Sequence, residues 1–145
     1  MNYSELIDKY VPADDVFLFN TGCAQKAWLL LGCRYMDEIK MHRFAVWAPN
    51  AQSVSLVGDF NGWDPAKTPM EKRGGIWYCF ASGLNNGDLY KYCVTTSAGK
   101  TVWKSDPFAQ WSQSGVNTAS MVWTGSHIWR DEVFMRSRAE KNCFA

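Results

Sequence analysis

Charge of one sign does not gather anywhere in this sequence. The 145 residues hold 15 lysines and arginines against 14 aspartates and glutamates, a formal net charge of +1 at pH 7. The basic residues are scattered along the whole chain, so no basic stripe is available to neutralise a phosphate backbone. Nucleic acid is therefore not an expected partner. A chain of this length suits one domain with its own core.

Long hydrophobic runs are also missing. No stretch approaches the roughly 20 apolar residues that cross a membrane. The first residues, Met-Asn-Tyr-Ser-Glu, lack the basic and apolar regions of a signal peptide. We therefore expect no membrane partner and a cytoplasmic location.

Cysteine and histidine follow no pattern of a metal site or a disulfide framework. The five cysteines are odd in number and form no Cys-x-x-Cys pair, and His42 lies far along the chain from His127. Cys79 and Cys93 fall in β-like runs and are expected as small core residues in a reducing compartment. Nothing in the pattern supports a redox role, a metal ion or another cofactor.

Aromatic residues, by contrast, are abundant. The chain has 8 Trp, 8 Phe and 6 Tyr. Some must form the core, and the simplest alternative is that all of them do, but eight indoles are more than one small β core needs. Trp63 ends a polar Asn-Gly-Trp turn, which can carry a flat indole into solvent on a rigid base. Such a surface suits stacking on the apolar face of a sugar ring.

Periodicity divides the chain into three parts. Apolar residues at helical spacing predict short helices over 4–11 and about 23–31, the first beginning at a Ser cap and ending before Pro12. From Arg34 the period becomes two, which predicts six or seven short strands, among them 54–60, 76–81, 89–95, 100–104 and 119–123. This pattern favours an all-β, immunoglobulin-like β-sandwich. We expect a helical preface over 1–33, the sandwich over 34–124, and an irregular linker over 125–145.

Five motifs in order resemble the N-terminal region of bacterial 1,4-α-glucan (glycogen) branching enzymes. They are Phe-Ala-Val-Trp-Ala-Pro-Asn-Ala (44–51), Val-Gly-Asp-Phe-Asn-Gly-Trp-Asp (57–64), Gly-Asp-Leu-Tyr-Lys-Tyr (87–92), Lys-Ser-Asp-Pro-Phe-Ala (104–109) and the closing Trp-Arg-Asp-Glu-Val-Phe (129–134). The resemblance covers about residues 17–145. It implies a family 48 carbohydrate-binding module, an early-set immunoglobulin-like sandwich similar to the glycogen-binding domain of the AMP-activated protein kinase β subunit.

The resemblance also implies a set of sugar-binding residues, namely Trp63, Lys91, Trp103, Val116 and Thr118. Two indoles would stack on pyranose C–H groups, while Lys91 and Thr118 would orient hydroxyls that otherwise lose water without replacement. Ser120 stands where the kinase-type domains carry an asparagine, and this departure implies a lower affinity.

No catalytic residue is expected within the chain. A branching reaction needs three carboxylates at the top of a (β/α)₈ barrel, which takes at least about 200 further residues. Asp59 and Asp64 flank Trp63, and we interpret Asp59 as a strand-end hydrogen-bonding residue and Asp64 as a turn former before Pro65.

Three functions agree with these observations. The chain is expected to bind or position α-1,4-glucan (glycogen, maltooligosaccharides) for its own catalytic barrel, which lies outside it. One alternative is that the chain is a structural brace of that barrel. Its apolar cluster of Trp111, Trp123, Trp129 and Phe134 would then make the chain self-associate when it is alone. The other is a stand-alone regulatory domain that tethers a kinase-like partner to glycogen.

Overall fold

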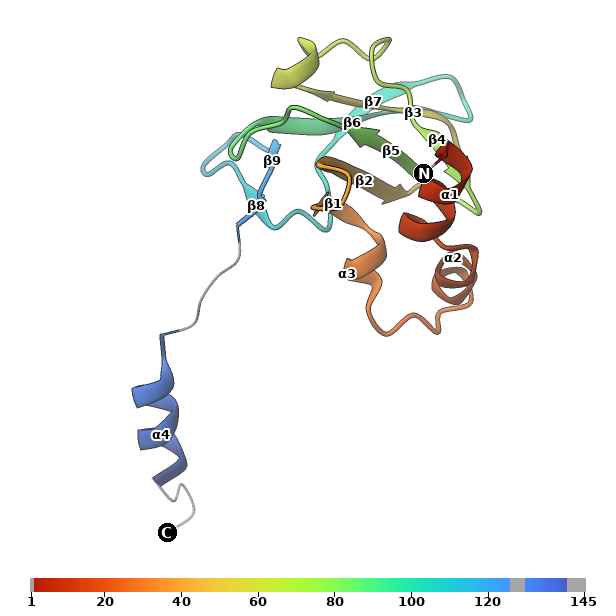
Figure 1. The fold of residues 1–145 in the computed structure, drawn as a ribbon. Helices are drawn as coiled ribbons and strands as arrows, with labels where there is room; N and C mark the ends of the chain where they lie inside the picture. The colour runs from red at the N-terminus through yellow and green to blue at the C-terminus, as the bar shows by residue number, and fades with distance from the viewer. Residues whose placement is uncertain (1, 126–129, 141–145) are drawn as a thin grey trace.

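The computed structural model describes residues 2–125 and 130–140, which form two antiparallel sheets with helices before and after them (Figure 1). The strands are β1 (Gly32–Met36), β2 (Met41–Trp47), β3 (Ala51–Gly58), β4 (Glu71–Arg73), β5 (Ile76–Ala81), β6 (Leu89–Thr96), β7 (Thr101–Lys104), β8 (Trp111–Ser112) and β9 (Ser120–Met121). The helices are α1 (Tyr3–Tyr10), α2 (Ala13–Asn20), α3 (Ala27–Leu30) and α4 (Glu132–Glu140), with a 3₁₀ turn η1 (Asp59–Asn61).

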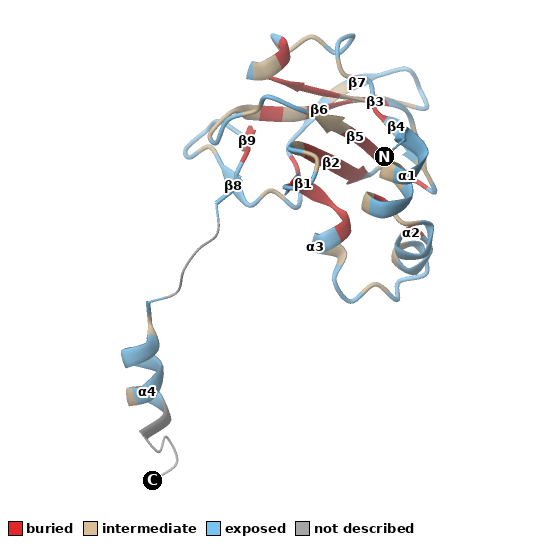
Figure 2. Cartoon of the chain, in the orientation of Figure 1, coloured by how far each residue is buried: buried red, intermediate tan, exposed pale blue. Residues whose placement is uncertain are grey.

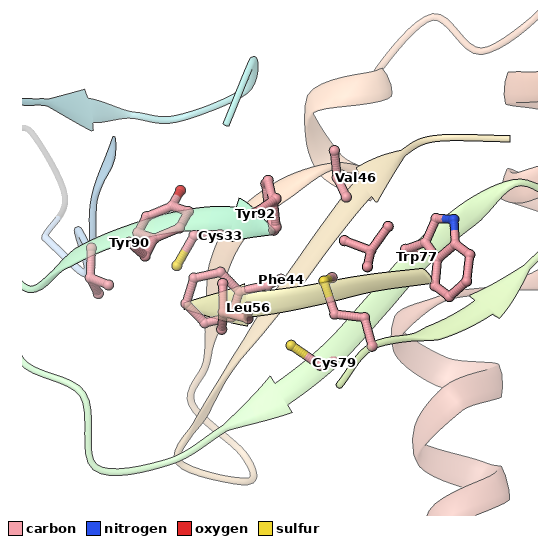
Figure 3. Packing of buried hydrophobic residues seen from close by; sticks show 11 residues of the cluster. Cys33, Phe44, Val46, Leu56, Trp77, Cys79, Tyr90 and Tyr92 are labelled. Atoms are coloured by element: carbon pink, nitrogen blue, oxygen red, sulfur yellow. The ribbon is translucent and has the colours of Figure 1, made fainter. Parts of the chain in front are cut away.

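The two sheets share one core. One sheet has the order β1-β2-β5-β4 and the other the order β3-β6-β9-β8, with β7 also pairing with β6. Alternate residues of each strand point inward, so Phe44 of β2 meets Tyr90 of β6 edge-on, with ring centroids 5.0 Å apart. Phe44, Leu56, Tyr90 and Tyr92 are fully buried (Figure 3). This packing confirms the predicted all-β, immunoglobulin-like sandwich.

The helical preface covers the outer face of the first sheet. Its buried side chains pack on that face in a second apolar cluster made of Val11, Val16, Leu30, Leu31, Ala45, Ile76 and Tyr78. The central strands β2 and β5 are therefore largely buried on both sides, while the helices keep exposed outer faces (Figure 2). The helical preface and the first sheet of the sandwich thus bury apolar surface against each other.

Charged side chains fasten the preface to the sheet by bonds to backbone carbonyls. The buried Arg43 donates to the carbonyl oxygens of Tyr10 (2.8 Å) and Leu29 (3.1 Å), and burial lowers the pKa of its guanidinium to about 10. Arg73 donates to the Val11 carbonyl (3.0 Å) and pairs with Asp8 (2.9 Å). These bonds use the carbonyls that helix ends leave unpaired.

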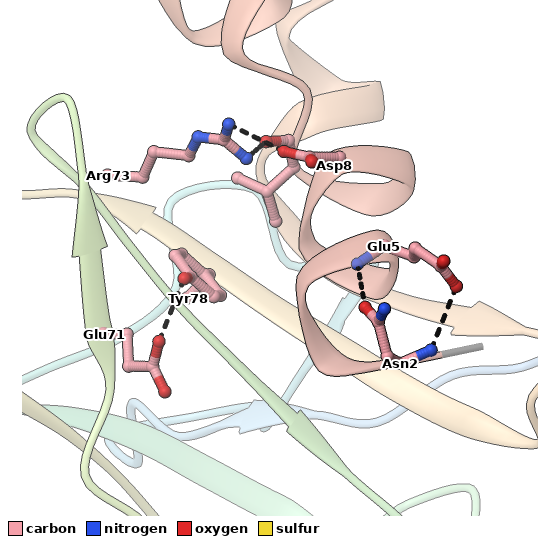
Figure 4. Close-up of polar contacts among 7 residues, drawn as sticks. Asn2, Glu5, Asp8, Glu71, Arg73 and Tyr78 are labelled. Atoms are coloured by element: carbon pink, nitrogen blue, oxygen red, sulfur yellow. Dashed lines mark hydrogen bonds and ion pairs between the residues drawn. The ribbon is translucent and has the colours of Figure 1, made fainter.

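Polar contacts also order the first helix. Asn2 caps α1 in a capping box with Glu5, so the cap lies two residues before the expected Ser4. The Tyr3 hydroxyl donates to Glu71 Oε1 at 2.7 Å. Glu71 Oε2 in turn accepts from Tyr78 at 3.0 Å (Figure 4). The first helix is therefore held by its own cap and by a contact with β4.

Several elements differ from the sequence prediction. Pro12 ends α1 but also begins α2, which was not predicted; proline is well suited to a helix start. The helix expected over 23–31 is limited to α3, and β1 begins two residues before position 34. The segment expected as an irregular linker contains α4, where three consecutive apolar residues (133–135) hide any helical period. The division into three parts stays a prediction.

The buried cysteines give the fold a pH dependence that can be measured. Burial raises the pKa of the Cys33 thiol from 9.0 to about 12, so the folded chain keeps a proton that the unfolded chain loses near pH 9. The stability linked to Cys33 is therefore complete below pH 9 and is lost between pH 9 and 12, by about 1.4 kcal/mol per pH unit.

Urea unfolding at pH 8 and at pH 10.5 tests this expectation. The free energy of unfolding should fall between the two values, and Cys33→Ala should fall less steeply because it has no thiol to titrate. Equal slopes in the two chains would contradict the role of Cys33.

Candidate functional site

The turn after β3 holds Trp63 in an unusual backbone conformation. Gly62 and Trp63 both have positive φ angles, 67° and 60°, and Trp63 is one of two non-glycine residues with a positive φ in residues 2–125 and 130–140. The buried Asn61 fixes the turn, accepting from the Gly58 N–H (3.0 Å) and donating to the Leu56 carbonyl (2.9 Å) and to Thr68 Oγ1 (3.0 Å). A left-handed conformation is costly for a bulky residue, so the surrounding turn must impose it.

Asp59 orients the indole of Trp63. Its Oδ1 accepts from Trp63 Nε1 at 3.0 Å, and its Oδ2 accepts from the Leu89 N–H at 2.9 Å, which joins the turn to β6. Asp64 Oδ1 accepts from the Ala66 N–H at 3.0 Å, a local turn bond. These contacts agree with the roles inferred for the two carboxylates from the sequence.

Trp63 stacks on Trp103 of β7. Their ring centroids are 5.8 Å apart and their planes differ by 8°. Close contact between stacked rings needs only about 3.5–4.0 Å, so the centroid separation indicates laterally offset rings. Trp103 is 46% exposed. The pair therefore forms a broad apolar platform on the surface, carried by the turn after β3 and by β7.

Lys91 and Thr118 form a polar pair on the same face. Lys91 Nζ donates to Thr118 Oγ1 at 2.8 Å, and Ser105 Oγ bonds to the Thr118 carbonyl. Trp103 lies opposite Cys93 in the β6–β7 register, and Cys93 shares a face of β6 with Lys91. The indole pair and the lysine–threonine pair thus face the same side of the sheet.

Val116 and Ser120 are placed differently from these four residues. Val116 is 96% exposed in the loop before Thr118, and it belongs to neither apolar cluster of the described residues. Ser120 is buried and lies opposite Tyr90, where its Oγ accepts from the Asp106 N–H at 2.9 Å. Ser120 therefore does not reach the exposed face, and the lower affinity expected from it stays a prediction.

Ser105 is the contributor that sequence reasoning missed. Its hydroxyl holds the Thr118 carbonyl, while the next residue, Asp106, is buried in the core. The Lys-Ser-Asp-Pro motif contained the signal, since a serine beside a buried aspartate is well placed to tie a loop to the sheet.

Two further observations concern the described residues as a whole. Within residues 2–125 and 130–140, no group of three His, Cys, Asp or Glu side chains lies close enough to hold a metal ion. No helix in that same part of the chain is long and apolar enough to cross a membrane.

Comparison with known proteins places the chain in a family. The model of carbohydrate-binding module 48 (isoamylase N-terminal domain) matches residues 30–109. The 1,4-alpha-glucan branching enzyme GlgB of Aromatoleum aromaticum is 40% identical over 131 residues, which are 88% of this chain and 20% of that enzyme. The corresponding enzyme of Rubrobacter xylanophilus is 40% identical over 132 residues, 88% of this chain and 18% of the enzyme. The chain thus spans about one fifth of the length of these relatives.

A solved structure agrees in fold. A putative alpha amylase from Salmonella typhimurium superposes with a TM-score of 0.54 at 28% identity, covering 71% of this chain and 16% of that protein. The family match includes β1 to β7 and so the strands that carry Lys91 and Trp103. The chain therefore belongs to the carbohydrate-binding module 48 family, as its motifs predicted.

Proposed function

We propose that this chain is the N-terminal module of a 1,4-α-glucan branching enzyme and that it binds α-1,4-glucan through Trp63, Lys91, Trp103, Val116 and Thr118. The observation that carries the proposal is the offset stack of Trp63 on Trp103 beside the Lys91–Thr118 hydrogen bond. An apolar platform next to fixed hydroxyl and ammonium groups is the surface that a pyranose ring needs.

The spacing of the indoles favours one mode of binding. A sugar ring held between two indoles needs two van der Waals contacts, or about 7–8 Å between the planes. The centroids of Trp63 and Trp103 are only 5.8 Å apart. The sugar should therefore lie across the outer surface of the stacked pair, with Val116 as a further apolar contact. Lys91 and Thr118 then bond to hydroxyls at the edge of the ring.

The proposed role is to hold the substrate rather than to transform it. Branching chemistry requires a barrel with catalytic carboxylates, and this chain covers only about a fifth of the enzymes that it resembles. A weak glucan site on the same polypeptide as a catalytic barrel raises the local concentration of polymer without any new contact at the active site. The cytoplasmic location expected from the sequence stays a prediction.

Tryptophan fluorescence titrated with maltoheptaose tests the proposal. The chain should show a saturable change with a dissociation constant between about 1 μM and 1 mM. Trp103→Ala should weaken binding by about tenfold, because half of the platform is lost. Trp28→Ala is the matched control, since Trp28 on α3 is also half exposed but lies outside the platform. A flat titration at millimolar sugar would overturn glucan binding at this face.

One observation favours a bracing role as the second candidate. Trp111 and Trp123 meet edge-on, with centroids 5.6 Å apart, and both remain exposed. Phe134 on α4 is exposed as well, whereas Trp129 lies outside the described residues. An apolar pair close to where the chain continues would suit contact with a catalytic barrel, and in the chain alone it would promote self-association.

A further inference from the structure

A second exposed indole lies away from the face described above. Trp47 ends β2 and is 51% exposed. The ring of Phe19 on α2 packs against it edge-on, with centroids 5.9 Å apart and planes 69° apart. One side of the indole is thus supported by the preface. No hydrogen bond joins Trp47 Nε1 to any residue in the described part of the chain, so this N–H is free to donate.

The loop that follows Trp47 is held rigidly. The Ala48 carbonyl accepts from Trp77 Nε1 (2.9 Å), and the Ala48 N–H donates to the Gly75 carbonyl (3.0 Å). Lys72 Nζ donates to the Pro49 carbonyl at 2.8 Å. A side chain at position 75 would bring its Cβ within 3.2 Å of Pro49, which explains a glycine with φ +85° there. Three long-range bonds therefore fix the loop before any ligand arrives.

A cavity of about 350 Å³ opens beside this loop. Its apolar lining residues include Trp47, Pro49 and Val94, and its polar ones are Asn50, Thr96 and Ser97. Thr96 Oγ1 accepts from the Lys100 N–H at 3.2 Å, and its own hydroxyl proton can still donate. No charged side chain lines this cavity, unlike the cavity at the preface, whose wall includes Lys9, Asp37, Glu38 and Arg43. The Lys72 ammonium nearby is already bonded to the Pro49 carbonyl, so the uncharged lining favours a neutral ligand over a phosphate or carboxylate.

We propose that this cavity is a second binding site for a neutral oligosaccharide. The pyranose ring stacks on the indole of Trp47, and its hydroxyls bond to Asn50, Thr96, Ser97 and the free indole N–H. An indole beside amide and hydroxyl groups matches a ligand with an apolar face and a neutral polar rim. The choice of α-1,4-glucan as that oligosaccharide rests on the proposed function.

The second site is separate from the first. Thr96 lies five residues after Lys91 along β6, a distance of about 17 Å at the usual rise of a strand. Neither Trp63 nor Trp103 lines the cavity at Trp47. Two weak sites on one rigid domain would hold a long glucan better than either site alone.

Proton–nitrogen correlation NMR of the tryptophan indoles tests the proposal on the 145-residue chain. Maltoheptaose should shift the Trp47 indole signal saturably, with the signal assigned from its loss in Trp47→Phe. The same shift should persist in Trp63→Gly, with a dissociation constant changed by no more than about twofold, because distant sites act independently. The indole of Trp28, equally exposed, is the internal control and should stay still.

Each outcome separates this proposal from the proposed function. Shifts at Trp47, Trp63 and Trp103 support both sites. Shifts at Trp63 and Trp103 alone overturn the second site and leave the proposed function standing. A shift at Trp47 alone supports the second site and refutes the first. If Trp47→Phe keeps its other indole signals in place, the fold is intact and the missing signal is that of Trp47.

Discussion

Asp106→Ala should lower the free energy of unfolding by about 4 kcal/mol. The carboxylate is buried, and its Oδ2 accepts from the hydroxyls of Tyr90 (2.7 Å) and Tyr92 (3.2 Å). Its Oδ1 accepts from the Phe108 N–H at 2.9 Å. Alanine would leave both buried hydroxyls without this acceptor, each at a cost of about 1–3 kcal/mol, and would add a cavity.

Urea unfolding followed by far-UV circular dichroism measures this loss. Asp106→Asn should lose less, because an amide oxygen still accepts from the two tyrosines. Asp64→Ala is the matched control: its carboxylate makes a single turn bond near the surface, so the expected cost is about 1 kcal/mol. A free energy for Asp106→Ala equal to that of Asp64→Ala would contradict the central role of the buried carboxylate.

The segment that contains Asp106 also connects the core to the proposed glucan face. Burial raises the pKa of Asp106, while the tyrosine hydroxyls and the Phe108 N–H act in the opposite direction by bonding to the carboxylate. Ser105, which directly precedes Asp106, bonds to the Thr118 carbonyl, and the Thr118 hydroxyl accepts from Lys91. The late loop is therefore held by a segment whose position is set inside the sandwich.

Two of the longer strands could be predicted from the sequence. β6 was predicted within one residue, because it has one buried face and alternation reports this directly. β5 was predicted with its observed bounds, 76–81, because a Gly-Gly turn precedes its apolar run, although it is buried on both faces. β8 and β9 have two residues each, too few for any period. Helix α2 was not predicted, because its apolar residues 16–19 are consecutive and only Val16 is buried. Tertiary packing, rather than a local pattern, decides such elements.

The candidate site was predictable to the extent that it is local. The Asn-Gly-Trp turn and the two roles of Asp59 and Asp64 follow from neighbouring residues, and the structure agrees with them. The grouping of Trp63 with Trp103 at one site came from a family resemblance, not from spacing, and their direct stacking, which joins segments 40 residues apart, was not predicted. The position of Ser120 depends on the pairing of β9 with β6, which no local pattern reports. Contacts and strand pairing between segments distant in the sequence could therefore not be predicted from local patterns.

Trp63→Gly should weaken maltoheptaose binding at the Trp63–Trp103 face by about 50-fold or more, because the indole surface that the sugar would cover is gone. The effect on stability should be small. Trp63 has φ 60°, a conformation that costs an L-residue about 1–2 kcal/mol and a glycine almost nothing. Relief of this strain offsets the lost contact with Trp103.

Trp63→Ala separates the two effects, since it removes the indole and keeps a Cβ in the left-handed region. Both variants should bind equally poorly at that face, measured by the shift of the Trp103 indole signal in NMR, while the glycine variant should be the more stable by about 1 kcal/mol in urea. A sequence selected for stability alone would place glycine or asparagine at position 63. If Trp63→Gly is clearly less stable than the unsubstituted chain, the indole is there for packing; if it keeps the stability of that chain and has lost sugar binding, the strained tryptophan is retained for the ligand.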